Sequence, residues 1–231
     1  MSAFLASSAF FSLLLSLAAY GIGCLARKKL GLAICNPLLI AVAIVIAALQ
    51  VLDVSYDDYL QSAGHISYLL TPATVCLAIP LYEKTHLLRR HWKALLAGIT
   101  GGSLAGLAGI YGLSLLFGFQ RQIYVTLLPK SITTAIGMDV SAELGGYVSV
   151  TVAVIILTGV LGSVIAEGVC RRFRITDPGA RGVALGTSAH AIGTAKAMEL
   201  GEVEGAMSSL AIVVAGLFTV AAAPLFGGLP L

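Results

Sequence analysis

Six long apolar runs constrain the fold of this chain more than any other feature. They lie at about residues 3–26, 32–52, 62–82, 94–118, 147–170 and 206–227. A helix rises about 1.5 Å per residue, so a run of about twenty residues crosses the roughly 30 Å hydrocarbon core of a bilayer. The runs lack the alternation of polar and apolar residues that a membrane barrel requires. With 58% hydrophobic and 11% charged residues, residues 1–231 are predicted to form one all-α integral membrane domain with about six full transmembrane helices.

Neither the first run nor the cysteines indicate an export signal, a disulfide framework or a metal site. The first charge is Arg27, and no polar cleavage region follows, so a retained span is expected rather than a signal peptide. Cys24, Cys35, Cys76 and Cys170 lie within or beside apolar runs without paired spacing, and we interpret them as buried, inert thiols. The net charge of +3 is small and dispersed, which excludes nucleic acid as a partner.

The basic residues predict an orientation. They cluster at Arg27–Lys29, in the loop Glu83–Lys93 and at Arg171–Arg174. Lys and Arg are enriched in cytoplasmic loops of membrane proteins. This rule places the N-terminus and the acidic stretch Asp53–Asp58 outside, in a multi-pass protein of the inner (cytoplasmic) membrane.

The same rule predicts two segments that enter the bilayer and return. Segment 122–146 must begin and end outside if run 147–170 is to deliver its arginines to the cytoplasm. Its length, about 24 residues, is too short for two full spans but allows a re-entrant hairpin of two half-helices. Segment 182–204 would enter from inside. Residues 1–118 then form four spans, and 119–231 form two hairpin-plus-span repeats in inverted topology; a single crossing of 122–146 with a weak basic bias is the alternative.

A pattern of two triplets occurs once in each of these segments. Its copies are Ala135-Ile136-Gly137 with Glu143-Leu144-Gly145, and Ala191-Ile192-Gly193 with Glu199-Leu200-Gly201. Paired, glycine-interrupted polar segments at corresponding positions of a membrane protein indicate a transporter binding site. A chance match in so biased a composition is the alternative.

Polar side chains of the two hairpins are the candidate substrate-binding residues. They are Lys130, Ser131, Thr133 and Thr134 in the first hairpin and Ser188, His190, Gly193 and Thr194 in the second. An ammonium within the bilayer costs about 2.5–3.5 kcal/mol and therefore needs a partner or a wet cavity. Together with hydroxyls and a helix N-terminus it suits a small carboxylate. Alternatively, Lys130 reaches the membrane surface or forms a structural ion pair with Asp139 or Glu143.

Two further groups of ionisable residues allow two interpretations each. The pKa of an unperturbed histidine, about 6.5, would let His190 carry a proton, but a neutral, hydrogen-bonded core histidine is the alternative. Glu199, Glu202 and Glu204 are either solvated or balance the charge of Lys196.

Proline and glycine punctuate two of the long runs. Pro72 lies between Thr71 and Thr74 in the third run. It predicts either a kink satisfied by those hydroxyls or an unwound stretch lining a pathway. Small residues also recur every four positions in the fourth run, which predicts close helix packing. These are Gly98, Gly102 and Gly106, and Gly101, Ala105 and Gly109.

No constellation of catalytic residues is present in the sequence. It contains neither a Gly-x-Ser-x-Gly elbow nor a His-Glu-x-x-His motif, and no nucleophile, base and orienting group come together. We expect neither an enzyme nor a bound cofactor or metal.

Several of these motifs together give a family resemblance that covers nearly the whole chain. They are Asn36-Pro37-Leu38-Leu39, Thr71-Pro72-Ala73-Thr74, Leu128-Pro129-Lys130-Ser131, Ala184-Leu185-Gly186-Thr187-Ser188 and His190-Ala191-Ile192-Gly193-Thr194. With them the chain resembles the LrgB/CidB family of antiholin-like membrane proteins. Through the resemblance, Asn36, Thr71, Pro72 and Thr74 join the candidate binding residues. Ala135 departs from the family pattern, which usually has proline at this position after the threonine pair.

The resemblance implies two functions. One is transport of small monocarboxylates such as pyruvate, glycolate or glycerate by alternating access, as in a plastid glycolate/glycerate transporter with a fused domain of this kind. The other is holin/antiholin-like regulation of murein hydrolase export and cell lysis. It also implies a small partner membrane protein of the LrgA/CidA type; from the packing spans we expect a homodimer. The residues themselves favour transport, because a carrier needs fixed Lys, His and hydroxyl groups on broken helices. A non-transporting scaffold subunit is a third possibility.

Overall fold

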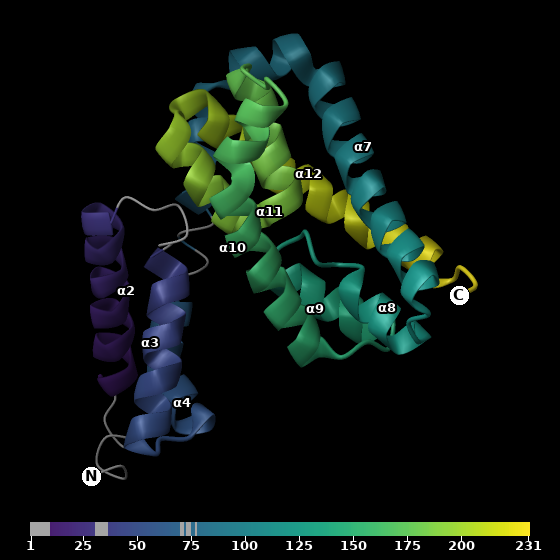
Figure 1. Ribbon diagram of the computed structural model, residues 1–231. Helices are drawn as coiled ribbons and strands as arrows, with labels where there is room; N and C mark the ends of the chain where they lie inside the picture. Colours follow the sequence, from purple (N-terminus) through teal and green to yellow (C-terminus); the bar gives the residue numbers. More distant parts are fainter. Residues whose placement is uncertain (1–9, 31–36, 70–71, 73–74, 77) are drawn as a thin grey trace. The chain divides into compact units, whose positions relative to one another are not determined.

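The described part of the chain is entirely helical. The computed structural model describes residues 10–30, 37–69, 72, 75–76 and 78–231, and it has no strand there (Figure 1). Its named helices are α2 (Phe11–Leu30), α3 (Pro37–Leu52), α4 (Tyr56–Ser67), α6 (Ala78–Glu83), α7 (Thr85–Phe117), α8 (Arg121–Leu127), α9 (Thr134–Glu143), α10 (Val148–Arg172), α11 (Pro178–Leu200) and α12 (Glu202–Gly227). The chain divides into two units, Met1–Cys76 and Leu77–Leu231. The all-α prediction is confirmed.

The first unit contains α2, α3 and α4. α2 approaches α3 so closely at Gly23 that a Cβ there would clash with the Pro37 carbonyl. A hydrogen bond of 2.8 Å between the Ser16 and Tyr59 hydroxyls joins α2 to α4. α4 begins after Ser55, whose Oγ accepts a hydrogen bond from the Asp58 amide at 3.1 Å, as in an N-cap.

Four helices of the described part are long and apolar enough to cross a membrane. They are α2, α7 from Arg89 onward, α10 and α12. Together they support a multi-pass membrane protein, although fewer full spans than the six predicted. α3 has 16 residues, about 24 Å of helix, which is shorter than the hydrocarbon core.

The structure corrects three details of the prediction. In the described part of run 62–82, no single helix covers the run, because α4 ends at Ser67 and α6 begins at Ala78. The predicted basic loop is mostly helical, since α7 begins at Thr85 and only kinks at His91 (φ −116°, ψ 16°). Among the cysteines of the described residues, Cys24 and Cys76 are exposed and only Cys170 is buried; all three are free thiols.

The second unit is held together by α11 and α12. Gly182 and Gly186 of α11 face the backbone of α12, where a Cβ would clash with the Glu204 and Ser208 carbonyls. Glycine at these two positions therefore permits a helix–helix approach that no other residue allows. Leu95 and Ile99 of α7 complete the apolar cluster around this contact.

Each of the two predicted hairpin segments is broken. In the first, α8 ends at Leu127 and α9 begins at Thr134, with a turn between them. In the second, α11 loses helical geometry at Ala189 (φ −128°, ψ 15°) and His190 (φ 42°, ψ −134°). Leu185 and Ala197 flank this break and share one buried cluster. Twelve residues of straight helix would separate them by about 18 Å, so the second half of α11 folds back on the first.

The repeated pattern marks equivalent structural positions in the two segments. In each copy the first triplet directly follows the break: Ala135 lies at the start of α9, and Ala191 follows His190. In each copy the second triplet ends the short helix, with Gly145 in the left-handed region (φ 80°) and Gly201 capping α11. A membrane-length helix then follows, α10 or α12. The two copies therefore have the same local architecture.

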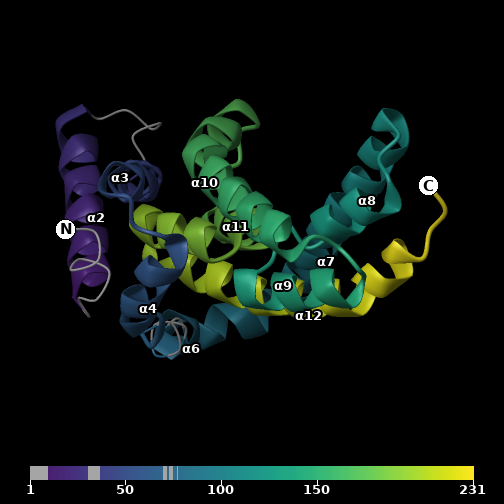
Figure 2. The same cartoon turned by 90° about the horizontal axis from the view of Figure 1, so that it is seen from below.

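The two broken segments lie at opposite ends of α12. At its start, which directly follows the second segment, Glu202 forms an ion pair of 2.9 Å with Lys84 beside the start of α7. At its end, the Tyr124 hydroxyl of α8 donates a hydrogen bond of 2.9 Å to the Phe226 carbonyl. Ile132 and Val140 pack with Ala223 there, so that α9 lies beside the last turns of α12 (Figure 2).

Candidate binding cavity

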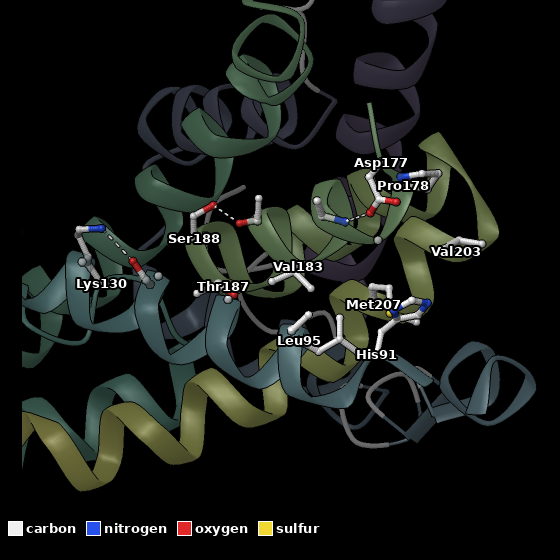
Figure 3. Close-up of a pocket in the computed structure, with 18 residues that line it drawn as sticks. His91, Leu95, Lys130, Asp177, Pro178, Val183, Thr187, Ser188, Val203 and Met207 are labelled. Atoms are coloured by element: carbon white, nitrogen blue, oxygen red, sulfur yellow. Dashed lines mark hydrogen bonds between the residues drawn. The ribbon is translucent and has the colours of Figure 1, made fainter. Parts of the chain in front are cut away.

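A cavity of about 730 Å³ lies between α7 and α11 in the second unit (Figure 3). The turn between α8 and α9 closes one end of it, and the first residues of α11 and α12 line the other. Its walls are largely apolar, with Leu95, Val183 and Met207 among the lining side chains. Its polar groups gather near the two ends.

Lys130 and Ser131 form the cationic end. Both belong to the turn between α8 and α9, which the buried Pro129 helps to anchor. Lys130 Nζ donates a hydrogen bond of 2.8 Å to Ser131 Oγ. Among the described residues, no carboxylate lies within ion-pairing distance of Lys130, so the alternative pairing with Asp139 or Glu143 is not found.

Thr187 and Ser188 of α11 face the same region of the cavity (Figure 3). Ser188 Oγ donates to the Ala184 carbonyl at 2.7 Å. The Thr187 side chain is 7% exposed, and its hydroxyl has no hydrogen-bond partner within the described part of the chain. A buried, unpaired hydroxyl is unfavourable by about 1–3 kcal/mol, so this group is free to bind a ligand or water. Sequence reasoning missed Thr187, although it directly precedes Ser188 in the polar run.

The glycine stripe of α7 forms one wall. At Gly102 a Cβ would lie 3.1 Å from Thr187 Cγ2, so this residue provides the close packing that the spacing predicted. At Gly106 a Cβ would meet no atom within 4 Å. Gly98, Gly102 and Gly106 all line the cavity, so the stripe shapes the cavity as well as the helix contact.

His91 and Asp177 lie at the opposite end of the cavity from Lys130 (Figure 3). Both residues are exposed. Asp177 Oδ1 accepts a hydrogen bond of 2.8 Å from the Ala180 amide and so caps α11. His91 lies at the kink of α7. These two polar residues form the mouth of the cavity.

Several sequence-predicted binding residues do not line this cavity. They are Thr133, Thr134, His190, Gly193 and Thr194. Thr194 Oγ1 shares a hydrogen bond of 2.7 Å with Ser208 Oγ of α12. Gly193 lies where a Cβ would meet the Leu185 carbonyl at 2.5 Å, so it permits the fold-back of α11.

Four predicted residues lie elsewhere in the chain. Asn36, Thr71 and Thr74 are outside the described residues. Pro72 is exposed and belongs to the first unit. Their predicted roles in binding stay predictions.

His190 occupies a buried position at the break of α11. It is 3% exposed, and its Nε2 donates a hydrogen bond of 2.9 Å to the Ile155 carbonyl of α10. Gly159 leaves room for the ring, because a Cβ there would lie 2.7 Å from Nε2. These contacts agree with the alternative of a hydrogen-bonded core histidine.

The charges of the second segment form local ion pairs. Lys196 Nζ lies 2.6 Å from Glu167 Oε1 and 3.4 Å from Glu199 Oε2. Glu199 therefore helps to balance Lys196, and Glu167 of α10 is a partner that the sequence did not indicate. Glu202 pairs with Lys84, whereas Glu204 is buried at 7% exposure.

A buried hydroxyl network fixes the first segment to α10. Thr151 Oγ1 donates to Ser141 Oγ at 2.7 Å and contacts the Thr126 carbonyl at 2.9 Å. The Tyr147 amide donates to Thr126 Oγ1 at 2.8 Å. These bonds join α8, α9 and α10, so the two helices that flank the turn carrying Lys130 are held in place relative to α10.

Comparison with known proteins gives the family. A model described as the LrgB-like family matches residues 16–229. This chain belongs to the LrgB-like family. The antiholin-like protein LrgB of Bacillus subtilis (strain 168) is 36% identical over 220 residues, 95% of each chain. The antiholin-like protein LrgB of Bacillus mycoides (strain KBAB4) is 35% identical over 218 residues, 94% of this chain and 95% of the relative. No solved structure matches.

The cavity offers this member of the LrgB-like family groups that can bind a small anion. Its polar equipment is one ammonium, the hydroxyls of Ser131, Thr187 and Ser188, and the two groups at its mouth. Among the described residues, no group of three or more His, Cys, Asp or Glu could hold a metal ion. An ammonium next to hydroxyl donors, surrounded by apolar walls, suits a small anion with an apolar body.

Proposed function

We propose that this protein binds a small monocarboxylate in the cavity and carries it across the membrane. The observation that supports this most is Lys130, which lines the cavity and whose ammonium has, among the described residues, only the Ser131 hydroxyl as its partner. A cation in a membrane protein without a counter-charge indicates a substrate or ion pathway. A carboxylate would supply the missing charge.

In this proposal the two broken segments are re-entrant hairpins that enter from opposite membrane faces. Their position at opposite ends of α12 supports this topology, as does the clustering of basic residues near one end. Lys84 lies beside the start of α12, and α10 ends with Arg171 and Arg172. With this end in the cytoplasm, His91 and Asp177 form a cytoplasmic mouth. The distribution of basic residues along the sequence is the separate ground for proposing that the N-terminus lies outside.

The substrate would bind with its carboxylate at Lys130 and Ser131. The Thr187 and Ser188 hydroxyls lie on the same cavity and would contact a keto or hydroxyl oxygen of pyruvate, glycolate or glycerate. Leu95 and Val183 supply apolar contacts for the carbon atoms. The large volume leaves room for water beside so small an acid.

The names of the relatives favour a second candidate function over transport. They are called antiholin-like, which corresponds to regulation of murein hydrolase export and cell lysis, and their names give no support to monocarboxylate transport. A small LrgA/CidA-type membrane protein and a second copy of this chain are the proposed partners in either function. Uptake therefore has to be measured with and without the small partner.

Uptake into proteoliposomes separates the two functions. The transport proposal expects saturable uptake of labelled pyruvate or glycolate, which Lys130→Ala abolishes. Lys196→Ala is the matched control, because Lys196 is ion-paired and does not line the cavity. Leakage of a trapped dye without saturation would support the holin-like function instead. The absence of both uptake and leakage would indicate a scaffold subunit.

A further inference from the structure

A second, much smaller pocket continues the cavity beyond Lys130. It has a volume of about 10 Å³ and shares Gly106 and Ser131 with the large cavity. A space of this size holds about one water molecule. These two residues line both pockets, so the small pocket adjoins the large cavity.

Three residues that carry hydroxyl groups, each from a different element, line this small pocket. They are Ser103 of α7, Ser131 of the turn and Thr219 of α12. Ser103 is 8% exposed, and its Oγ has no hydrogen-bond partner within the described residues. An unsatisfied buried hydroxyl of this kind needs a ligand or a water molecule. The polar character of the cavity thus extends past Lys130 along α7.

Beyond the hydroxyls the path stops at apolar side chains. Leu107, Ile110 and Leu128 line the small pocket and are 3%, 5% and 2% exposed. They belong to one buried cluster with Tyr124 and Val125 of α8. This cluster fills the end of the second unit opposite His91 and Asp177.

Two hydrogen bonds hold this end closed. The Tyr124 hydroxyl donates to the Phe226 carbonyl, and the Tyr111 hydroxyl donates to the Pro230 carbonyl, each at 2.9 Å. They join α7 and α8 to the last residues of the chain. The two ends of the path therefore differ: the mouth is polar and exposed, whereas the far end is apolar and sealed.

We propose that Ser103, Ser131 and Thr219 form an inner polar subsite of the path, and that Leu107, Ile110 and Leu128 form the closed gate behind it. The subsite takes a water molecule while the gate is closed and the carboxylate of the substrate in transit. This inference rests on the proposed transport function and its membrane topology. It adds the residues through which the anion leaves Lys130. It also assigns the described second unit to a state that is open toward His91 and Asp177 and closed at the gate.

Thiol accessibility tests the sidedness of the gate without any substrate. Ser103→Cys is made in the full chain with Cys24, Cys35, Cys76 and Cys170 replaced by serine. Ag⁺, a thiol reagent not much larger than a water molecule, is then added to one side of oriented vesicles. We expect reaction from the side of His91 and Asp177 only. Reaction from both sides, or from neither, would overturn the proposal.

Truncation of the gate should open the far side. Leu128→Ala is expected to make the introduced thiol reactive from the far side and to speed passive leakage of pyruvate about tenfold, a change in barrier of about 1.4 kcal/mol. Leu107→Ala is the second variant in case the first does not fold. Leu185→Ala is the matched control, since Leu185 is also 3% exposed but packs with Ala166 and Ala197 at the second hairpin.

The outcomes separate the gate from the proposed function. If Leu128→Ala and Leu107→Ala behave like Leu185→Ala in both measurements, the gate is refuted even though the parent protein transports. The other case is a parent protein that shows no saturable uptake while the thiol of the Ser103→Cys variant reacts from one side only. In that case the transport function is refuted, and the closure of the far end is retained.

Discussion

Replacing Lys130 with methionine should weaken substrate binding and stabilise the protein at the same time. Methionine keeps most of the length of the side chain but removes the charge. A hydrogen bond to a charged group contributes about 1.5–3 kcal/mol. At about 1.4 kcal/mol per factor of ten, its loss weakens monocarboxylate affinity by about 10- to 150-fold.

The gain in stability follows from the surroundings of Lys130. Its ammonium has a single hydroxyl partner, Ser131, and no carboxylate among the described residues within ion-pairing distance. An ammonium within the bilayer costs about 2.5–3.5 kcal/mol. Lys130 is half-buried, so the free energy of unfolding should rise by a fraction of this, on the order of 1 kcal/mol.

Lys196→Met should change both quantities in a different way. Lys196 contacts both Glu167 and Glu199, so its loss removes one ion-pair interaction from each carboxylate. Both carboxylates are half-exposed, and the expected loss of stability is therefore below about 1 kcal/mol. Substrate affinity should stay unchanged, because Lys196 does not line the cavity.

Equilibrium binding and thermal unfolding of the purified protein in detergent measure the two effects. Unfolding is followed with and without pyruvate, because a ligand that binds only the folded state raises Tm. The reasoning is refuted if Lys130→Met lowers the Tm of the free protein by as much as Lys196→Met does. It is equally refuted if pyruvate raises the Tm of Lys130→Met as much as that of the parent.

Three further predictions concern other residues of the second unit. Gly106→Val should lower saturable uptake about tenfold or more by filling the cavity, with the fold intact. Gly109→Val is the control, because a Cβ at Gly109 also meets no atom within 4 Å, and it should leave uptake unchanged. Equal uptake in both variants would contradict the assignment of the cavity. Thr151→Val should destabilise the protein by about 1–3 kcal/mol, measured by thermal unfolding, because it leaves the Ser141 hydroxyl without its donor. His190→Gln should leave the pH profile of uptake unchanged, since the histidine is buried away from the cavity; a shifted profile would restore a proton-carrying role.

The sequence predicted both broken segments because their ends were constrained. The basic clusters require both ends of segment 122–146 to lie on the same side, and its length is too short for two full spans, so a hairpin is the favoured prediction. Pro129 lies in the turn between α8 and α9. The second break was harder to place. It falls at Ala189 and His190, neither of which is proline or glycine, and His190 adopts a positive φ of 42°. Packing against α10 overrides the local preference there, and a single sequence contains no sign of that contact.

The candidate site was only partly predictable for a related reason. Lys130, Ser131 and Ser188 were recognised because polar groups in an apolar chain stand out, and all three line the cavity. Thr194 stands out equally, yet it pairs with Ser208 in the core. Which polar residue faces a cavity and which faces another helix depends on how the helices rotate about their axes. That rotation is set by distant contacts such as those of Gly182 and Gly186 with α12.

Both broken segments contact one residue of α10, Ile155. Ile155 accepts the hydrogen bond of His190 through its carbonyl, and its side chain fills the space that the missing Cβ of Gly137 leaves free. A displacement of Ile155 would therefore be expected to change the packing of both segments at once. In the proposed topology, in which the two segments enter from opposite membrane faces, α10 is an element that links them.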